Sequence, residues 1–576
     1  MLTAAQKTRV SLAIMGFLMI AAALWARLLW LQVLHPDHWV SIARRQHVQV
    51  LELQAVRGAI LDRNLRPLAV SLRLSSVFAD PRHVKDPASA ACQLAPLLGR
   101  PAEKIRQQLS RRDRGFVWLS RRIPNQTAAR VRELRIPAVY LMMESQRFYP
   151  NGHLASHVIG FAGMDTQGLE GMELVCDRLL HGDPGWRWLS RDARRRLVGA
   201  WDTATVRPRD GLDVVLNLDR SIQFFAERAL EQGIREYRAK GGSVIVMDPV
   251  TGEVLALAIR PSYDPNLFWK VQPDQRRNRA LTDTFEPGSV FKVVTAAVAL
   301  GLKAVRPEDR FDCEQGEYTV AGRVLHDYRP HGVLTFREVI IHSSNIGVAK
   351  VAMRLGAAPI YNGMKAFGVG DRTGIDLPGE APGMAKHPSQ WSRPSITTIP
   401  MGHEVSVNAV QLAQIISTVA NGGVLIRPWV IREVRDAAGQ VISRFQPKPV
   451  RRVITREVAG QLKEILAAVV TEGTGKAAQV PGFLAGGKTG TAEKIEPDGS
   501  YSKSRNVSSF VGFVPVENPR LAIAVVVDEP GYPFTGGAVA APIFRKIATD
   551  ALAYLGTLPR LVTAAIGHPV PHEERY

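Results

Sequence analysis

The amino-acid sequence predicts an α+β protein in which a membrane-spanning helix and an arginine-rich region precede a larger domain, where helices cover an antiparallel sheet. Three observations support this: an uncharged segment near the N-terminus, a turn signal near residue 208, and strand-like segments at both ends of residues 207–556. The chain of 576 residues is too long for one ordinary domain, and its 46% of hydrophobic residues is typical of globular proteins.

The membrane helix is predicted from an uncharged run over residues 10–26, which continues after Arg27 into the apolar residues 28–34. Such a run is just long enough to span a bilayer. A cleaved signal peptide is the main alternative, because the small residues at 21–23 offer a cleavage site. The apolar stretch extends too far for a signal peptide, so we expect an uncleaved anchor over residues 1–35.

Lys7 and Arg9 lie before this helix and predict its orientation, because cytoplasmic flanks are enriched in positive charge. We therefore expect a single-pass protein of the inner (plasma) membrane with a cytoplasmic N-terminus. The chain after about residue 35 would be extracytoplasmic, in the periplasm.

The net charge of +20 indicates an anionic partner or environment, such as nucleic acid, a phospholipid surface or an acidic cell-wall polymer. The basic residues concentrate in residues 111–135 and 186–209, interspersed with Trp118, Trp186, Trp188 and Trp201. This pattern can serve nucleic-acid stacking, but a solvated basic face with inward tryptophans is the commoner arrangement. Together with the extracytoplasmic location, this predicts no nucleic-acid partner.

Cys92, Cys176 and Cys313 are far apart and form no C-x-x-C pair. The sequence therefore predicts no disulfide framework, no metal site and no cofactor.

Residues 36–206 are expected to form a separate N-terminal domain without catalytic residues. A strand-like piece at 47–53 and a helical piece at 102–109 are its clearest elements. Three clusters stand out at residues 57–64, 147–150 and 168–173; we interpret them as turns and ion-pairing residues.

A turn signal at residues 208–211 marks the start of a second domain, predicted to span 207–556. Its first elements are a strand at 212–218, a helix from Arg220 capped by Asp219, and two strands at 243–247 and 254–259 joined by a turn. Strands at 484–491, 508–516 and 521–528 and a helix at 541–555 close the domain. Residues 557–576 are predicted to be a tail.

The first candidate for chemistry is Ser289, which follows a Pro-Gly turn at the start of an apolar helix that also carries Lys292. The i, i+3 spacing places the lysine amine about one turn from the hydroxyl. Burial lowers the pKa of a lysine, which would let Lys292 take the serine proton. Ser500 and Lys503 repeat the Ser-x-x-Lys spacing in a polar loop, where we interpret Ser500 as a turn residue.

Two further motifs follow. Ser343-Ser344-Asn345 is expected within a helical stretch at 334–355, where its hydroxyl and amide can relay a proton and hold a peptide bond. Lys488-Thr489-Gly490-Thr491 ends a strand-like run: Gly490 permits close approach of a substrate backbone, Lys488 supplies a cation, and Thr489 and Thr491 can donate to a carboxylate. Each motif alone is weak, but the three in this order occur in penicillin-binding proteins and class A β-lactamases.

From the anchor to about residue 556, the chain resembles the class B penicillin-binding proteins, monofunctional transpeptidases of cell-wall synthesis. The three N-terminal clusters look like the signatures of that family's elongated, dimerisation-type pedestal domain. Residues 278–283, 508–515 and 536–542 resemble the division-specific FtsI type. The turn Met401-Gly402-His403-Glu404 departs from the version commonest in proteobacterial division enzymes.

The resemblance implies that Ser289 attacks the penultimate D-alanine of a peptidoglycan stem peptide, with Lys292 as base. Ser343 would pass a proton to the leaving amine, Asn345 would hold the donor peptide, and Lys488, Thr489 and Thr491 would bind its carboxylate. The backbone N–H groups of Ser289 and Thr491 would stabilise the oxyanion. It also implies inhibition by β-lactams and partnership with an FtsW-type glycan polymerase and divisome proteins.

Other functions remain open at this point. An elongation-specific transpeptidase, a D,D-carboxypeptidase and an inactive divisome scaffold share much of the pattern. A β-lactamase or β-lactam sensor would use the same serine and lysine, but the Glu-x-x-Leu-Asn pattern of class A deacylation is absent between Ser343 and Lys488. The sequence does not indicate the oligomeric state.

Overall fold

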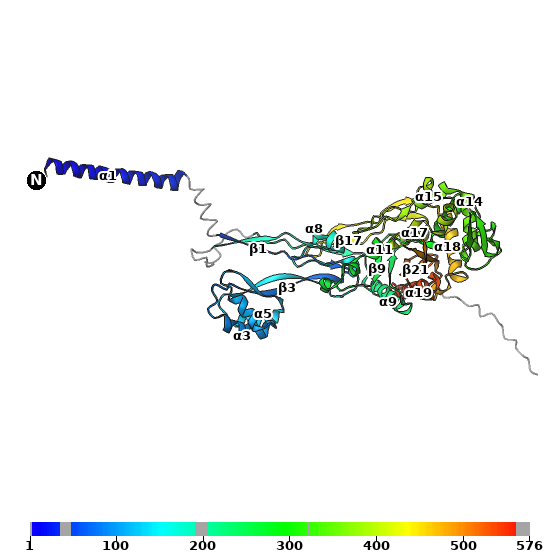
Figure 1. The fold of residues 1–576 in the computed structure, drawn as a ribbon, viewed down its shortest axis with the longest axis horizontal. Coiled ribbons are helices and arrows are strands. Elements are labelled where there is room, and N and C mark those ends of the chain that lie inside the picture. Colours follow the sequence, from blue (N-terminus) through cyan, green and yellow to red (C-terminus); the bar gives the residue numbers. More distant parts are fainter. Residues whose placement is uncertain (1–2, 35–47, 191–205, 321, 497, 560–576) are drawn as a thin grey trace, which may run out of the picture. The chain divides into compact units, whose positions relative to one another are not determined.

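The structure is a computed structural model that describes residues 3–34, 48–190, 206–320, 322–496 and 498–559 (Figure 1). It forms two compact units, one of Met1–Val56 with Gly182–Asp210 and one of Arg57–His181 with Gly211–Tyr576. The predicted domain boundaries after residues 35, 206 and 556 stay predictions. The tail beyond residue 559 and Trp201 lie outside the described residues.

In the first unit, α1 (Ala4–Leu29) continues as the π-helix η1 (Trp30–Leu34). Together they form a helix of 31 residues that is long and apolar enough to cross a membrane, which fits a single-pass anchor. Farther along the chain, β1 (Val48–Leu53) pairs antiparallel with β6 (Gly185–Ser190), so the strand expected at 47–53 is present.

The second unit contains a small module in which α3 (Pro87–Leu98), α4 (Ala102–Leu109) and α5 (Asn125–Glu133) cover one face of three strands. The strands are β3 (Pro67–Ala79), β4 (Val117–Ile123) and β5 (Val139–Phe148), with β3 in the middle.

Trp118 lies on the other face of this small sheet, half-buried, with its ring edge-on to the stacked rings of Phe78 and Phe116 and below the guanidinium of Arg121. Trp186, in contrast, is 39% exposed, so the expectation that the tryptophans turn inward is wrong for this residue. The strand β6 that carries Trp186 pairs only with β1 among the described strands, and a two-stranded ribbon offers little to bury it.

The three N-terminal clusters meet in one buried ion-pair network. Glu173 is entirely buried and accepts from Arg57 Nε at 2.7 Å and from Arg147 Nε at 2.6 Å. Arg57 also pairs with Asp177 at 2.6 Å, and the Tyr149 hydroxyl donates to Glu173 at 3.2 Å. The interpretation of these clusters as ion-pairing residues is confirmed.

A seven-stranded sheet connects this network to the rest of the second unit. Its path runs β18 (Val441–Arg444), β17 (Ile431–Arg435), β7 (Asp213–Leu216), β2 (Ile60–Leu61), β3 and β4, with β5 attached to β3. Backbone hydrogen bonds thus join the small module, through β2, to the strands β7, β17 and β18.

The central feature of residues 211–559 is a five-stranded antiparallel sheet in the order β20-β21-β22-β8-β9. Its strands are β8 (Gly241–Met247), β9 (Val254–Arg260), β20 (Gly486–Ile495), β21 (Tyr501–Val514) and β22 (Leu521–Asp528). All were expected from the sequence, although β21 begins earlier than predicted. Strands from both ends of the domain are therefore neighbours, and β20 lies at an edge.

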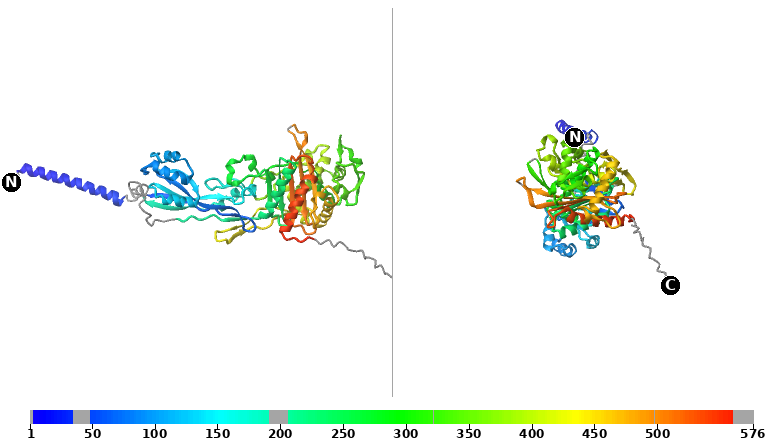
Figure 2. Two further views of the ribbon diagram at one scale, coloured as in Figure 1. Left: turned by 90° about the horizontal axis from the view of Figure 1, so that it is seen from below. Right: turned by 90° about the vertical axis from the view of Figure 1, so that its right-hand side faces the viewer.

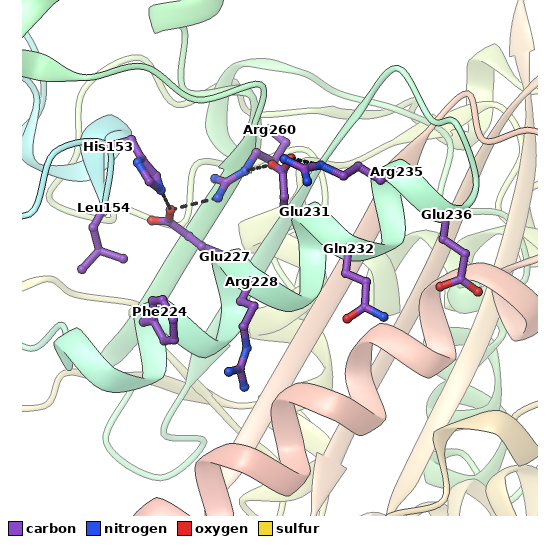
Figure 3. A pocket seen from close by; sticks show the side chains of 10 residues that line it. All are labelled: His153, Leu154, Phe224, Glu227, Arg228, Glu231, Gln232, Arg235, Glu236 and Arg260. Carbon is purple, nitrogen blue, oxygen red and sulfur yellow. Dashed lines mark hydrogen bonds and ion pairs between the residues drawn. The ribbon is translucent and has the colours of Figure 1, made fainter.

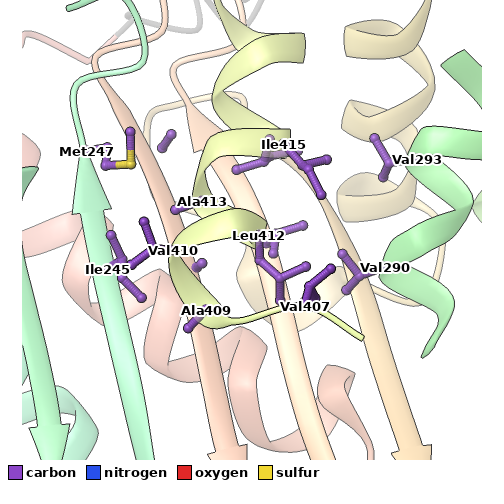
Figure 4. Packing of buried hydrophobic residues seen from close by; sticks show 14 of the residues in the cluster. Ile245, Met247, Val290, Val293, Val407, Ala409, Val410, Leu412, Ala413 and Ile415 are labelled. Atoms are coloured by element: carbon purple, nitrogen blue, oxygen red, sulfur yellow. The ribbon is translucent and has the colours of Figure 1, made fainter. Parts of the chain in front are cut away.

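Helices cover both faces of this sheet. α9 (Arg220–Glu236), capped by Asp219 as predicted, and α19 (Gly536–Tyr554) lie on one face (Figure 2). On the other face α17 (Ala409–Ala420) packs against Ile245 and Met247 of β8, and Val290 and Val293 belong to the same hydrophobic core (Figure 4).

Two further helices, α12 (Lys292–Gly301) and α18 (Arg456–Thr471), belong to that second layer. The remaining elements are α6 (Ser156–Ile159), α7 (Gly171–Val175), α8 (Asp177–Leu180), η2 (Pro265–Lys270), α10 (Pro273–Arg276), α11 (Arg279–Thr282), η3 (Gly288–Phe291), β10 (Arg310–Asp312), η4 (Glu314–Gly316), β11 (Glu317–Val320), β12 (Arg323–His326), β13 (Val333–Thr335), α13 (Phe336–Ile341), α14 (Asn345–Leu355), α15 (Ala357–Ala366), β14 (Met384–Ala385), η5 (Pro388–Gln390), α16 (Ser395–Thr398), η6 (Ile399–Met401), β15 (Val405–Ser406), β16 (Val424–Ile426), β19 (Pro449–Arg452) and η7 (Lys476–Ala478).

A charged cavity of about 660 Å³ borders α9 (Figure 3). Arg260 of β9 bonds Glu227 at 3.1 Å and Glu231 at 2.6 Å, and Glu227 also accepts from the backbone N–H of Ala155 at 2.7 Å. These contacts attach the segment before α6 to the sheet layer, so the polar groups serve the fold.

We expect Glu173→Gln to lower the free energy of unfolding by about 3–5 kcal/mol, because it leaves two buried guanidinium groups without full compensation. Urea unfolding of the full chain in detergent, followed by tryptophan fluorescence, measures this. Glu103→Gln is the control: Glu103 pairs with Arg106 at an exposed site, so its loss should change the free energy of unfolding only slightly. Equal losses in the two variants would contradict the expectation.

Candidate active site

Ser289 lies in η3, a 3-10 turn that leads into α12, so the serine begins a buried helix as predicted. Gly288 has a φ of +54°, and a Cβ there would lie 2.7 Å from the Thr491 carbonyl oxygen. On the other side, Gly288 N–H donates to the Gly402 carbonyl at 3.2 Å. Residues 285–289, which we call the nucleophile loop after the predicted role of Ser289, are therefore held between β20 and the turn at Gly402, and only glycine fits at 288.

Lys292 is entirely buried, and its amine donates to the Ser343 carbonyl at 2.6 Å, to Asn345 Oδ1 at 2.8 Å and to Ser343 Oγ at 3.2 Å. Within the residues that the structure describes, no hydrogen bond joins this amine to Ser289 Oγ. Burial lowers the pKa of Lys292 to about 7, against the opposing effect of Asp327 and Cys313. Near neutral pH a large fraction of this amine is unprotonated.

The stretch at 334–355 is two helices rather than the one expected. α13 ends at Ile341 and α14 begins at Asn345. Between them Ser343 has a φ of +62°, in the left-handed region, and Ser344 caps α14 by accepting from Gly347 N–H at 2.9 Å. The single-helix prediction is wrong because a serine side chain competes for backbone N–H groups. Strained backbone of this kind is typical of functional sites.

Lys488 lies on β20 and is entirely buried as well. Its amine donates to Ser343 Oγ at 3.0 Å and to the Thr489 carbonyl at 3.1 Å. Burial, and then the neighbouring Lys292, hold the pKa of Lys488 well below its usual value. Two lysine amines thus converge on one hydroxyl, and the three predicted motifs meet there.

The residues after Lys488 complete this edge of the sheet. Thr489 Oγ1 lies 2.8 Å from Thr474 Oγ1, and Thr491 Oγ1 accepts from Gly536 N–H at 3.1 Å. A Cβ on Gly490 would lie 2.4 Å from Ser509 Oγ and 2.8 Å from the Pro287 carbonyl oxygen. Gly490 is therefore required for close packing of β20 against the nucleophile loop.

Asp327 is a site residue that the sequence did not reveal. It follows β12, and its carboxylate accepts from Ser344 Oγ at 2.6 Å, from Ile346 N–H at 3.0 Å and from Asn345 N–H. Asn345 Nδ2 in turn donates to the His326 carbonyl at 2.9 Å. Asp327 thereby fixes the Ser-x-Asn turn; as one acid in a polar stretch it carries no motif.

The other serine motifs have structural roles. Ser500 is exposed in the turn between β20 and β21 and donates to Asp498 at 2.7 Å, so its interpretation as a turn residue is confirmed. Asn408 ends a second Ser-x-Asn match, Ser406-Val407-Asn408, and caps α17 by accepting from Gln411 N–H at 2.8 Å.

The fold and the converging motifs define a penicillin-binding serine transpeptidase, and comparisons with known proteins agree. Residues 242–549 match the penicillin-binding protein transpeptidase domain, and residues 52–216 match the penicillin-binding protein dimerisation domain. The chain is 34% identical to a probable peptidoglycan D,D-transpeptidase PenA of Neisseria meningitidis, over 97% of this chain and 95% of the relative. It is 35% identical to stage V sporulation protein D of Bacillus subtilis (93% and 84%).

The chain is also 31% identical to the peptidoglycan D,D-transpeptidase FtsI of Escherichia coli, over 95% of this chain and 92% of the relative. Among solved structures, penicillin-binding protein 3 of Mycobacterium tuberculosis in complex with aztreonam aligns with a TM-score of 0.69 and 28% identity, over 88% of this chain and 98% of that one. The chain belongs to the class B penicillin-binding proteins.

The lowered pKa of Lys292 predicts the pH dependence of acylation by a fluorescent penicillin. With Lys292 in its predicted role as the base, only the unprotonated amine would accept the serine proton, so the rate should fall about tenfold per pH unit below about pH 7. Lys292→Arg keeps its charge at every pH and should lose about 100-fold or more in rate.

The control for this measurement is Lys350→Arg, since Lys350 pairs with Glu314 outside the site. A wild-type rate that does not change between pH 5 and 8 would argue against Lys292 as the base.

Proposed function

We propose that this protein cross-links peptidoglycan stem peptides as a D,D-transpeptidase through a Ser289 acyl-enzyme, in septal cell-wall synthesis. The transpeptidase activity is that of its family. The observation that best supports the site is the convergence of the Lys292 and Lys488 amines on Ser343 Oγ, beside the helix that carries Ser289.

In the first step, Ser289 Oγ attacks the carbonyl carbon of the penultimate D-alanine and its proton passes to Lys292. The pKa of Lys292, near 7, matches a general base at neutral pH. The oxyanion rests on the backbone N–H groups of Ser289 and Thr491, contacts usually worth about 3–4 kcal/mol each in the transition state.

The C–N bond to the terminal D-alanine then breaks, and Ser343 passes a proton from a lysine ammonium to the leaving nitrogen. Ser343 Oγ contacts both amines and is therefore suited to this transfer. Asn345 holds the donor peptide, and Lys488, Thr489 and Thr491 bind the carboxylate of the terminal residue. Gly490 lets the donor peptide approach the outer edge of β20, which has no further strand beside it among the described residues.

An amine from a neighbouring stem peptide completes the reaction. It attacks the ester carbonyl, loses a proton to the lysine base and releases Ser289 Oγ as the restored hydroxyl. Since β-lactams resemble the donor peptide and acylate the same serine in this family, they are the expected inhibitors.

The proposed cellular setting is division. The N-terminal helix fits an anchor in the inner membrane, and Lys7 and Arg9 before it support a cytoplasmic N-terminus and a periplasmic catalytic domain. An FtsW-type glycan polymerase and other divisome proteins are the proposed partners. Residues 278–283, 508–515 and 536–542 favour the division-specific type over elongation.

Ser289→Ala should abolish the covalent adduct with a fluorescent penicillin and all transpeptidation, because it removes the nucleophile. Intact mass and peptide mapping of the full chain in detergent measure the adduct. Ser500→Ala, which alters the second Ser-x-x-Lys match in an exposed turn, should keep wild-type labelling. An adduct retained by Ser289→Ala, or none in the wild type, would refute the proposed nucleophile.

A fluorescent protein fused to the N-terminus should be fluorescent in the cytoplasm and concentrate at midcell in dividing cells. Depletion of the protein should block septation. Uniform labelling of the lateral wall, with loss of cell shape on depletion, would instead support an elongation-specific transpeptidase.

A further inference from the structure

The nucleophile loop is hydrogen-bonded along its length to residues 402–407, which the proposed catalytic mechanism does not use. Phe285 and Val407 exchange two backbone hydrogen bonds of 3.0 Å, and Gly288 N–H donates to the Gly402 carbonyl. Gly402 has a φ of +91°, and a Cβ there would lie 2.2 Å from the Gly288 carbonyl oxygen. The position of Ser289 therefore depends on the turn at residues 401–404.

Three hydrogen-bond donors meet at the side chain of Glu286, three residues before Ser289. Its carboxylate accepts from His403 Nδ1 at 2.8 Å, from Glu404 N–H at 2.8 Å and from the Tyr501 hydroxyl at 3.2 Å. Only 9% of the Glu286 side chain is exposed. Each lost donor would leave a largely buried carboxylate under-bonded, which is costly.

Tyr501 brings a third segment to the same point. It is the first residue of β21 and pairs with Ile495, the last residue of β20, across the hairpin. The register of the hairpin shifts between Glu493 and Ile495, so its outer end is irregular. The ring of His403 also meets the ring of Tyr501 edge to face, with centroids 5.4 Å apart.

Lys494 gives this end of the hairpin another attachment, to Asp528 at 2.5 Å and Glu529 at 2.7 Å. That contact joins β20 to β22 and the residue after it, within the same sheet. The contacts of Tyr501 differ because they join the hairpin to the nucleophile loop and the turn at 401–404. Burial and the Glu286 charge raise the pKa of Tyr501, so its hydroxyl stays a donor at neutral pH.

We propose that Glu286, His403 and Tyr501 form a latch that holds the β20–β21 hairpin against the nucleophile loop and so positions Thr491 relative to Ser289 for acylation. These are positioning residues, acting through the backbone of the loop and the hairpin. The inference rests on the proposed function, in which the N–H groups of Ser289 and Thr491 share the oxyanion. A displacement of about 1 Å between such groups can cost about 100-fold in rate.

The hydroxyl contact is tested by Tyr501→Phe, with Tyr554→Phe as a matched control. Both tyrosines are 39% exposed, and both hydroxyls donate to a carboxylate at 3.2 Å, that of Tyr554 to Asp219 on the far side of the sheet. The full chain in detergent is acylated with a fluorescent penicillin. We expect Tyr501→Phe to lower the first-order acylation rate about fivefold or more, and the control to stay within about twofold of wild type.

His403 permits a rescue experiment. Asparagine can place an N–H donor near the position of histidine Nδ1, whereas alanine cannot. His403→Ala should therefore lose more acylation rate than His403→Asn, with the dissociation constant of the initial penicillin complex nearly unchanged in both. A purely structural role would give parallel losses of melting temperature and rate.

Amide hydrogen exchange over residues 486–514 gives a readout that does not depend on catalysis. We expect faster exchange at the outer end of the hairpin in Tyr501→Phe and unchanged exchange there in Tyr554→Phe. Unchanged exchange or an unchanged acylation rate in Tyr501→Phe would overturn the latch. A wild type without an adduct on Ser289 would refute the proposed function, and hairpin exchange would still decide whether the latch exists.

Discussion

The active site depends on one shared hydrogen-bond acceptor, Ser343 Oγ, on which the amines of two buried lysines converge. Burying an amine is costly unless it is well bonded, and two neighbouring amines also repel each other when charged. Lys292 and Lys488 offset this cost by donating hydrogen bonds to carbonyl and hydroxyl oxygens, and burial lowers the pKa of both amines. The left-handed backbone at Ser343 and the hydrogen bonds that Asp327 accepts from Ser344 Oγ and Ile346 N–H hold that acceptor in place.

The rest of the second unit provides rigidity for this arrangement. Strands from both ends of the domain form one sheet, so β20 and its Lys488 are fixed by hydrogen bonds to β21, and β21 by β22. The buried ion pairs of Glu173 and the seven-stranded sheet join the small N-terminal module to the same unit. Catalysis tolerates little displacement between the edge strand β20 and the loop that carries Ser289, and about 1 Å can already be costly. Their relative position therefore requires a rigid frame.

Much of the fold could be predicted because its signals are local. The uncharged run at 10–26, the cap at Asp219 and the apolar runs at 243–247 and 521–528 each depend on neighbouring residues. The prediction of one helix over 334–355 is wrong. Apolar residues lie at helical spacing on both sides of residues 342–345, but the Ser344 cap and Asp327 break the helix there. The exposure of Trp186 could not be predicted, because burial depends on packing partners that the local sequence does not specify.

The sequence by itself determined the family and the eight candidate site residues, from Ser289 to Thr491, because their identities and order form recognisable motifs. Only the tertiary structure decided that Lys292 and Lys488 both donate to Ser343 Oγ and that Asp327 fixes the Ser-x-Asn turn. It also decided that Glu286 accepts hydrogen bonds from His403 and Tyr501. The physical reason is distance along the chain: these groups come from segments tens to hundreds of residues apart, and burial and hydrogen bonding between them exist only after the sheet has brought those segments together.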